Sequence, residues 1–187
     1  MKLSDGTSMR LYRQTVEDFR MYPGMEIEDL DALRAHDSRY SAKMRAVRII
    51  SASSVSKRDL ETRLVRKGES EEQAKEAVKW LSDLNLLDDR QTARQIVERC
   101  IHKGYGLQRA KQALYEKQIP KTLWEEALEG YPDQLERIAD FLRSKLKDPD
   151  DPKQVKRAIH AALRRGHSYG DVKRALEMIG SEFEEEY

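Results

Sequence analysis

The sequence predicts an all-α protein, in which three tandem three-helix repeats form an elongated, curved body after a poorly defined N-terminal extension. First, glycine and proline are scarce, at 9 and 5 of 187 residues. Leu, Ala, Glu, Lys, Arg and Gln, which lose little rotamer freedom in a helix, are abundant. Second, apolar residues recur at helical spacing almost everywhere after residue 41. Third, a similar string returns at intervals of roughly 50 residues, near the long end of helical-repeat periods. Nine helices, grouped in threes, are therefore expected.

The extension is expected over residues 1–40, where Leu30 and Leu33 indicate one short helix. The first repeat is expected over residues 41–87. Two of its helices start where a side-chain oxygen can accept first-turn amides and an acid or amide follows three residues later. The starts are Ser56 with Asp59 and Ser70 with Gln73, and the apolar positions are Val47 and Ile50, then Leu60 and Leu64, then Ala74, Ala77, Val78 and Leu81.

The second repeat is expected over residues 88–130, starting at Asp88 with Gln91 three positions later. Its three helices are indicated in order by Ala93, Ile96, Val97, Cys100 and Ile101, by Leu107, Ala110 and Leu114, and by Leu123 or Trp124 with Ala127 and Leu128.

The third repeat is expected over residues 131–180, and residues 181–187 form an acidic tail. Asp151 precedes Pro152, which is tolerated at the first helical position because no amide is needed there. Ser168 with Asp171 marks the last helix start. The apolar positions are Leu135, Ile138, Ala139, Leu142 and Leu146, then Val155, Ala158, Ile159, Ala162 and Leu163, then Val172, Ala175, Leu176 and Ile179.

The recurring strings are DLETRLVRKGES, RAKQALYEKQIP and KRAIHAALRRGHS, in which Lys67, Lys117 and Arg165 take equivalent places. In each string a helix with an apolar stripe is followed by one or two basic residues, then by a short turn, and then by the third helix of the repeat. One such unit buries little apolar surface alone, so we expect neighbouring units to stack.

The stretch CIHKGYGLQRAKQAL predicts a tight corner between two helices of the second repeat. Gly104 can adopt the left-handed conformation that ends a helix, and Tyr105 can fold back on the preceding turn. Tyr105 also lies among Lys103, Arg109 and Lys111. This cluster either contacts a phosphate backbone or base, or is an ordinary solvated corner.

The charges are uneven along the chain although the net charge is only +1. Residues 41–180 carry 29 basic and 22 acidic side chains, whereas the tail carries four acids and no base. The repeats therefore either meet an acidic partner or form an ordinary solvated surface.

Residues for catalysis are sparse, with four histidines and one cysteine, and zinc spacings, phosphate-binding glycine loops and serine elbows are absent from the sequence. The pair Asp88 and Asp89 fits helix capping better than metal binding. Trp80 and Trp124 fit packing between units. We therefore expect no enzyme activity, no cofactor and no metal.

The only cysteine, Cys100, cannot form an internal disulfide, and the first ten residues lack the apolar core of a secretory signal. The sequence also lacks an apolar run long enough to span a bilayer. A soluble cytoplasmic protein without a membrane partner is expected.

The segment from Leu86 to Pro120 resembles the RecX family of bacterial regulators of the RecA recombinase. The resemblance rests on LDD at Leu87 to Asp89, Ala93, KGYG at Lys103 to Gly106, Leu114, Lys117 and Ile119. AVRIIS at Ala46 to Ser51, RDLETRLVRKG, and RRGHSYGDV at Arg164 to Val172 add support, and the first 40 residues fall outside it. Departures from the family pattern are Thr92 and His167, each in place of an aromatic, and Gln118 in place of a glycine.

The resemblance implies a non-catalytic, monomeric protein that binds RecA, and single-stranded DNA with or through RecA, in the groove of the filament. Filament growth, ATP hydrolysis, strand exchange and RecA-stimulated repressor cleavage would be inhibited, which regulates DNA repair, recombination and the SOS response. Two alternatives stay open: a stand-alone basic DNA-binding protein and a helical-repeat adaptor for an unrelated protein. The candidate contacts are basic or aromatic residues near the turns, namely Arg66, Lys67, Lys103, Tyr105, Arg109, Lys117, Arg164 and Arg165.

Overall fold

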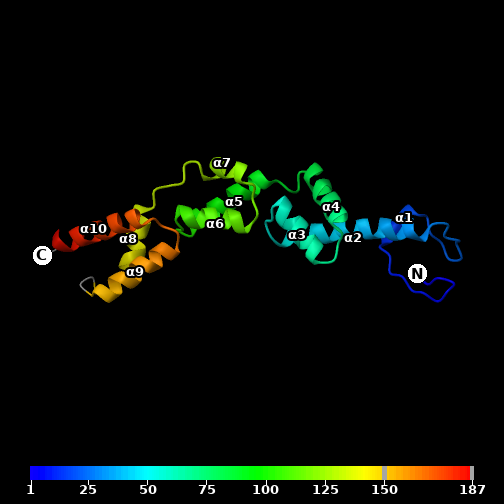
Figure 1. Ribbon diagram of the computed structural model, residues 1–187, viewed down its shortest axis with the longest axis horizontal. Helices are drawn as coiled ribbons and strands as arrows, with labels where there is room; N and C mark the ends of the chain where they lie inside the picture. Colours follow the sequence, from blue (N-terminus) through cyan, green and yellow to red (C-terminus); the bar gives the residue numbers. More distant parts are fainter. Residues whose placement is uncertain (149–150, 186–187) are drawn as a thin grey trace. The chain divides into compact units, whose positions relative to one another are not determined.

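The computed structural model describes residues 1–148 and 151–185, and these fold into α-helices joined by short loops (Figure 1). The helices are α1 (Arg13–Asp18), α2 (Leu30–Ala52), α3 (Lys57–Arg66), α4 (Glu71–Asp83), α5 (Asp89–His102), α6 (Leu107–Glu116), a 3-10 turn η1 (Lys121–Leu123), α7 (Trp124–Leu128), α8 (Leu135–Arg143), α9 (Pro152–Arg164) and α10 (Tyr169–Glu185). The all-α prediction is confirmed, and the nine expected helices are α2 to α10. The side chains of the predicted acidic tail lie outside the described residues.

The chain divides into two compact units, residues 1–88 and 89–187. The first holds the extension and α2 to α4, and the second holds α5 to α10. A single isolated antiparallel bridge, Lys2 to Ser8, is the only β pairing among the described residues.

The N-terminal extension continues directly into the first repeat through α2. The short helix expected near Leu30 and Leu33 is the beginning of a 23-residue helix that runs across position 40. Asp29 caps it by accepting the Ala32 amide at 2.8 Å. Asp37 in α2 also accepts from the hydroxyl of Thr15 in α1 at 2.8 Å. These bonds tie the extension to the repeat.

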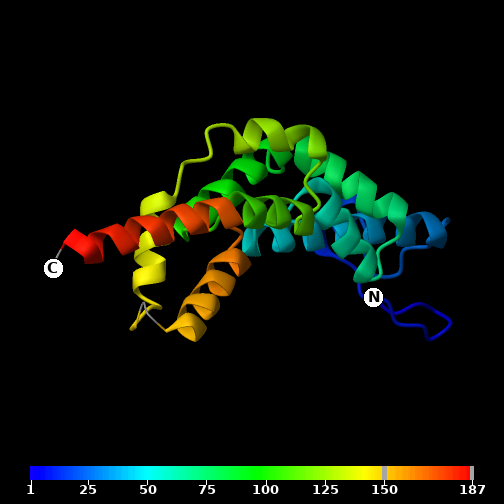
Figure 2. The same ribbon diagram turned by 60° about the vertical axis from the view of Figure 1, so that its left-hand side comes forward.

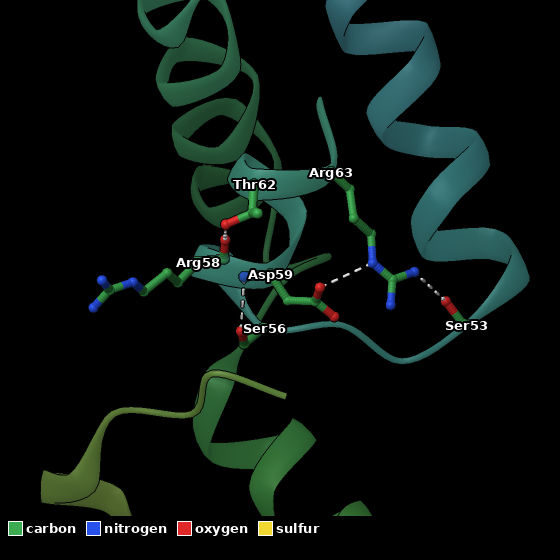
Figure 3. Close-up of polar contacts among 6 residues, drawn as sticks. All are labelled: Ser53, Ser56, Arg58, Asp59, Thr62 and Arg63. Carbon is green, nitrogen blue, oxygen red and sulfur yellow. Dashed lines mark hydrogen bonds and ion pairs between the residues drawn. The ribbon is translucent and has the colours of Figure 1, made fainter. Parts of the chain in front are cut away.

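The first repeat packs α2, α3 and α4 around one apolar core. Ser56 caps α3 as expected, accepting the Asp59 amide at 3.0 Å. Asp59 pairs with Arg63 one turn later at 2.9 Å, and Arg63 reaches back to the Ser53 hydroxyl at 3.4 Å (Figure 3). The core side chains are Ala42, Ala46, Val55, Leu60, Leu64, Ala74, Ala77, Val78, Leu81 and Leu87, with half-buried Trp80 against them.

The second helix of every repeat ends in the same turn, which supports the equivalence inferred from the recurring strings. The cap residues of α3, α6 and α9 are Lys67, Lys117 and Arg165. Each is followed by a left-handed residue whose amide donates at 2.9 Å to a carbonyl three residues back, as in a Schellman motif. The left-handed residues are Gly68 (φ +93°), Gln118 (φ +52°) and Gly166 (φ +86°).

The second unit contains two further cores, one for each repeat. In the second repeat α5 packs on α6, η1 and α7, and Trp124 donates to the Ile119 carbonyl at 3.0 Å. In the third repeat α10 lies across α8 and also contacts α9 (Figure 2). The buried apolar clusters consist of Ala93, Ile96, Val97, Leu114 and Ile119 in the second repeat, and Ile138, Ala139, Leu142, Ala158, Ala162, Val172, Ala175 and Ile179 in the third.

Candidate functional site

The GYG corner ends α5 in the predicted way. Gly104 has φ +62°, and the amide of Tyr105 returns to the Cys100 carbonyl at 2.9 Å. The prediction for Gly104 and Tyr105 is therefore confirmed. The corner also meets the third repeat, and we call this contact the repeat joint. It is formed by residues 100–109 of the second repeat and residues 131–141 and 164–167 of the third.

At the repeat joint, basic side chains of the third repeat cap the end of α5. Arg137 donates to the Ile101 carbonyl, and Arg165 donates to the Lys103 carbonyl. His167 places Nε2 3.2 Å from the Gly104 carbonyl oxygen. The last carbonyls of a helix lack intrahelical donors and carry partial negative charge, so the two guanidinium groups stabilise them by charge and hydrogen bonding, and the imidazole stabilises them by hydrogen bonding alone.

At the start of α6, backbone amides of the second repeat donate in turn to carbonyls of the third repeat. The amide of Gly106 donates to the Arg165 carbonyl at 2.9 Å, and that of Gln108 donates to the Gly166 carbonyl at 3.2 Å. The amides of Gly106, the N-cap of α6, and of Gln108 in its first turn thus pair with the carbonyls of the two residues that follow α9. Each repeat caps a helix of the other.

Two glycines permit this approach of backbone to backbone. A Cβ atom on Gly106 would lie 2.1 Å from the Gly166 carbonyl oxygen. A Cβ atom on Gly166 would lie 2.3 Å from the Arg109 amide nitrogen. Both distances are far shorter than a van der Waals contact, and the atoms met are backbone atoms that cannot move aside as a side chain could. The repeat joint therefore requires glycine at both positions.

Aromatic rings complete the repeat joint around Arg165. Its guanidinium carbon lies 5.1 Å from the centre of the Tyr105 ring and 4.8 Å from that of the Phe141 ring. The Tyr131 hydroxyl donates to the Tyr105 carbonyl at 2.7 Å. Burial raises the pKa of Tyr131 to about 12, so this donor keeps its proton at neutral pH.

His167 lies buried in the repeat joint, with 7% of its surface exposed. Burial lowers the pKa of its imidazole, and nearby Arg165 acts in the same direction. The ring is therefore neutral at physiological pH, with the Nε2 proton directed to the Gly104 carbonyl.

The repeat joint brings together five of the eight candidate contacts. Lys103 and Arg164 are exposed beside it, whereas Tyr105 and Arg165 are half-buried and stack on each other. Arg109 pairs with Glu116 at 3.0 Å. The structure therefore gives Tyr105 and Arg165 an internal role and leaves Lys103 and Arg164 facing solvent.

The other three candidates lie at the ends of second helices. Lys117 is half-buried at the cap of α6, while Arg66 and Lys67 are exposed at the end of α3 in the first unit. The Lys67 carbonyl accepts from Arg45, whose guanidinium also pairs with buried Glu69 at 3.0 Å.

Several residues of the repeat joint were not found from the sequence. Arg137 is one arginine among many on an amphipathic helix, and its spacing carries no signal. The sequence did contain a signal for Gly166, because this residue occupies the same place in the recurring strings as the turn glycine Gly68. Its approach to Gly106 could not be inferred, since that contact joins residues far apart in the chain.

The second repeat also matches a known domain. A family model described as "RecX, second three-helix domain" matches residues 88–128, which are α5 to α7 with η1. "Regulatory protein RecX" of Vibrio campbellii is 27% identical over 139 residues, covering 73% of this chain and 90% of that protein. "Regulatory protein RecX" of Chlorobaculum tepidum is 28% identical over 142 residues, covering 74% and 88%. These similarities support an assignment of the chain to the RecX family.

Solved RecX structures have the same fold. A crystal structure of regulatory protein RecX superimposes with a TM-score of 0.65 at 19% identity, covering 92% of this chain and 89% of that one. RecX from Lactobacillus salivarius gives a TM-score of 0.66 at 20% identity, covering 78% and 98%.

The departures from the RecX pattern are accommodated locally. Thr92 is buried in α5, and Gln118 has a left-handed conformation with φ +52°. His167 takes a buried place and adds a hydrogen bond that an aromatic hydrocarbon ring cannot make. These substitutions leave the turn and the repeat joint intact.

Among residues 1–148 and 151–185, no three His, Cys, Asp or Glu side chains gather to hold a metal ion. Within the same residues, every helix is too short or too polar to cross a lipid bilayer.

Proposed function

We propose that this RecX-family chain is a non-enzymatic, cytoplasmic regulatory protein that binds RecA and RecA filaments on single-stranded DNA. It inhibits filament growth, ATP hydrolysis, strand exchange and RecA-stimulated repressor cleavage. It thereby regulates DNA repair, recombination and the SOS response. The observation that carries the proposal is the match of α5 to α7 to the second three-helix domain of RecX.

The repeat joint supports a specific contact surface for this function. Lys103 belongs to the second repeat and Arg164 to the third, and both are exposed beside the interlocked helix ends. Their charges are therefore held on one body, which suits an acidic protein surface or a DNA backbone. Arg165 and Tyr105 position this surface by holding the repeats together.

The test is the DNA-dependent ATPase of RecA with increasing amounts of this protein. Substoichiometric protein should lower the ATPase rate, and an unchanged rate at every ratio would remove the proposal. DNA binding without RecA that weakens steeply with salt would instead favour the stand-alone DNA-binding alternative.

Charge reversal then tests the surface. Lys103→Glu with Arg164→Glu should shift the inhibition curve to higher protein concentration. The matched control is Lys153→Glu with Lys156→Glu, which reverses two exposed charges in the first turns of α9. Inhibition curves that coincide for the two double variants would contradict this choice of residues. Arg109 is unsuitable for the test because it pairs with Glu116 and packs against Gly166.

A further inference from the structure

The second unit also carries an open groove whose charge is opposite to that of the repeats as a whole. It consists of two adjoining hollows of 840 Å³ and 340 Å³ that share Leu107 and Tyr131 in their walls. The larger hollow runs along α7 and the loop after it, and the smaller one reaches the first residues of α8 and α10. We call the two together the acidic groove.

The floor of the acidic groove is apolar. Leu107 is 37% exposed, Leu128 and Tyr131 are half-buried, and Ile138 is buried at the inner end. An apolar strip that remains open to solvent favours contact with apolar side chains of another chain.

The rim of the acidic groove is rich in carboxylates. Glu125 and Glu129 are exposed and make no ion pair within the described chain. Asp133 accepts the Leu135 amide at 2.9 Å, and its charge acts on nearby Arg174, whose pKa it helps Asp171 to raise, without a direct salt bridge among the described residues. Against these three, Lys111 is the only cation lining the two hollows that lacks a carboxylate partner among residues 1–148 and 151–185, because Arg174 is paired with Asp171 at 2.6 Å. The rim therefore has a negative surplus.

An unpaired amide lies in the wall of the smaller hollow. Gln134 is only 6% exposed, and neither its Nε2 nor its Oε1 has a hydrogen-bond partner among the described residues. A buried amide without partners costs free energy. A polypeptide segment offers both an N–H donor and a C=O acceptor, which together match the two atoms of this side chain.

We propose that the acidic groove binds a polypeptide segment of a protein partner that carries apolar and basic side chains. The apolar side chains cover Leu107 and Tyr131, the basic ones meet Glu125 and Glu129, and a main-chain amide pairs with Gln134. Phosphates are excluded because the rim repels them. This contact lies beyond the proposed function, since it defines a second surface of opposite charge to the one at Lys103 and Arg164.

The experiment uses the full chain and two fluorescein-labelled peptides of equal length, one of alternating Lys and Leu and one of alternating Glu and Leu. Fluorescence polarisation should show binding of the Lys–Leu peptide alone. Glu125→Gln with Glu129→Gln should weaken this binding about three- to tenfold, as expected for the loss of two exposed charge contacts. The matched control, Glu71→Gln with Glu72→Gln on exposed positions of α4, should leave it unchanged.

NMR locates the binding site independently. The Lys–Leu peptide should shift the backbone amides of Leu107, Tyr131 and Gln134 together with the Gln134 side-chain amide. Equal weakening by the two double variants, equal binding of the Glu–Leu peptide, or shifts confined to other regions would each overturn the proposal. Displacement of the peptide by oligothymidylate, with shifts of the same amides, would overturn it in favour of a nucleic-acid site. None of these measurements contains RecA. A negative result for the acidic groove therefore does not contradict the proposed inhibition of RecA, and a negative result for the inhibition does not contradict the groove.

Discussion

At the scale of the residue, the neutral imidazole of His167 makes the stability of the repeat joint depend on pH. Burial lowers its pKa in the folded chain below the value of about 6.5 that an unfolded histidine has. Above the unfolded pKa, both states are neutral and the group contributes no pH dependence. As the pH falls through that value, the unfolded chain takes up a proton that the folded chain does not, so stability is lost until the folded pKa is passed.

We therefore expect the free energy of unfolding to fall between about pH 7.5 and about pH 5.5, and His167→Gln to remove part of that fall. Urea unfolding followed by circular dichroism at both pH values measures the difference. His102→Gln, at an exposed histidine near the end of α5, is the control and should retain the full pH dependence. Identical pH dependence of His167→Gln and the wild type would show that the imidazole does not titrate as described.

Single residues also show which parts of the site the sequence could predict. The left-handed Gly104 and the caps Ser56, Ser70, Asp151 and Ser168 were predictable, because each acts within one turn of its own helix. The role of Arg165 was not predictable. Its partner Lys103 lies 62 residues away, and an arginine after a helix looks the same in the sequence whether it faces solvent or a neighbouring helix end.

At the scale of the element, the amide end of α6 and the carbonyl end of α9 meet without any side chain between them. The free energy of this contact depends on glycine at both positions, since Gly106 and Gly166 approach through backbone atoms that cannot move aside. Gly106 has an ordinary φ of −75°, so an added methyl group there tests the approach without backbone strain.

Gly106→Ala should lower the free energy of unfolding by about 1–3 kcal/mol or more, because the methyl group overlaps the Gly166 carbonyl. Chemical denaturation of the full chain measures this change. Gly180→Ala supplies the contrast, since nothing lies within 4 Å of its added Cβ inside α10. That variant should be stabilised by roughly 0.5–1 kcal/mol. Equal effects of the two substitutions would contradict the close approach.

The helices themselves were largely predictable, and the exception has a local cause. Apolar stripes and caps predicted α3 to α10 because each of these helices turns apolar side chains toward a core, although those of α7 are only partly buried. In α2 the buried residues are Leu33, Ala42 and Ala46, which are widely spaced among charged residues. The early part of α2 therefore gave almost no apolar stripe, and the sequence did not indicate that the helix runs from Leu30 to Ala52.

At the scale of the whole molecule, the chain divides into two compact units, and the second unit holds the second and third of the three predicted repeats. The second and third repeats fall in one unit because their helix ends cap each other at the repeat joint. Sequence similarity defines the repeat, whereas the reciprocal hydrogen bonds join two repeats within one compact unit. A recurring string alone cannot reveal this pairing.

We expect a fragment of residues 89–187 to be helical and to unfold in one cooperative transition. A fragment of residues 89–130 lacks Arg137, Arg165 and His167, so the end of α5 loses its donors and the start of α6 loses its acceptors. The shorter fragment should have weak helicity and a broad thermal transition. Thermal melts followed by circular dichroism compare the two. A sharp transition of the short fragment at the same temperature would show that the repeat joint is dispensable for folding.

The continuity of α2 makes the first repeat accessible to optical measurement. The helix is uninterrupted from Leu30 to Ala52. A dye attached to the cysteine introduced by Asp31→Cys, near the start of this helix, should therefore rotate together with the first repeat and not independently of it. The Asp31 side chain is 94% exposed. The native thiol of Cys100 is buried, and burial raises its pKa, so maleimide chemistry selects the introduced cysteine. Polarised emission from that single fluorophore would then follow the tumbling of the first repeat as a partner docks.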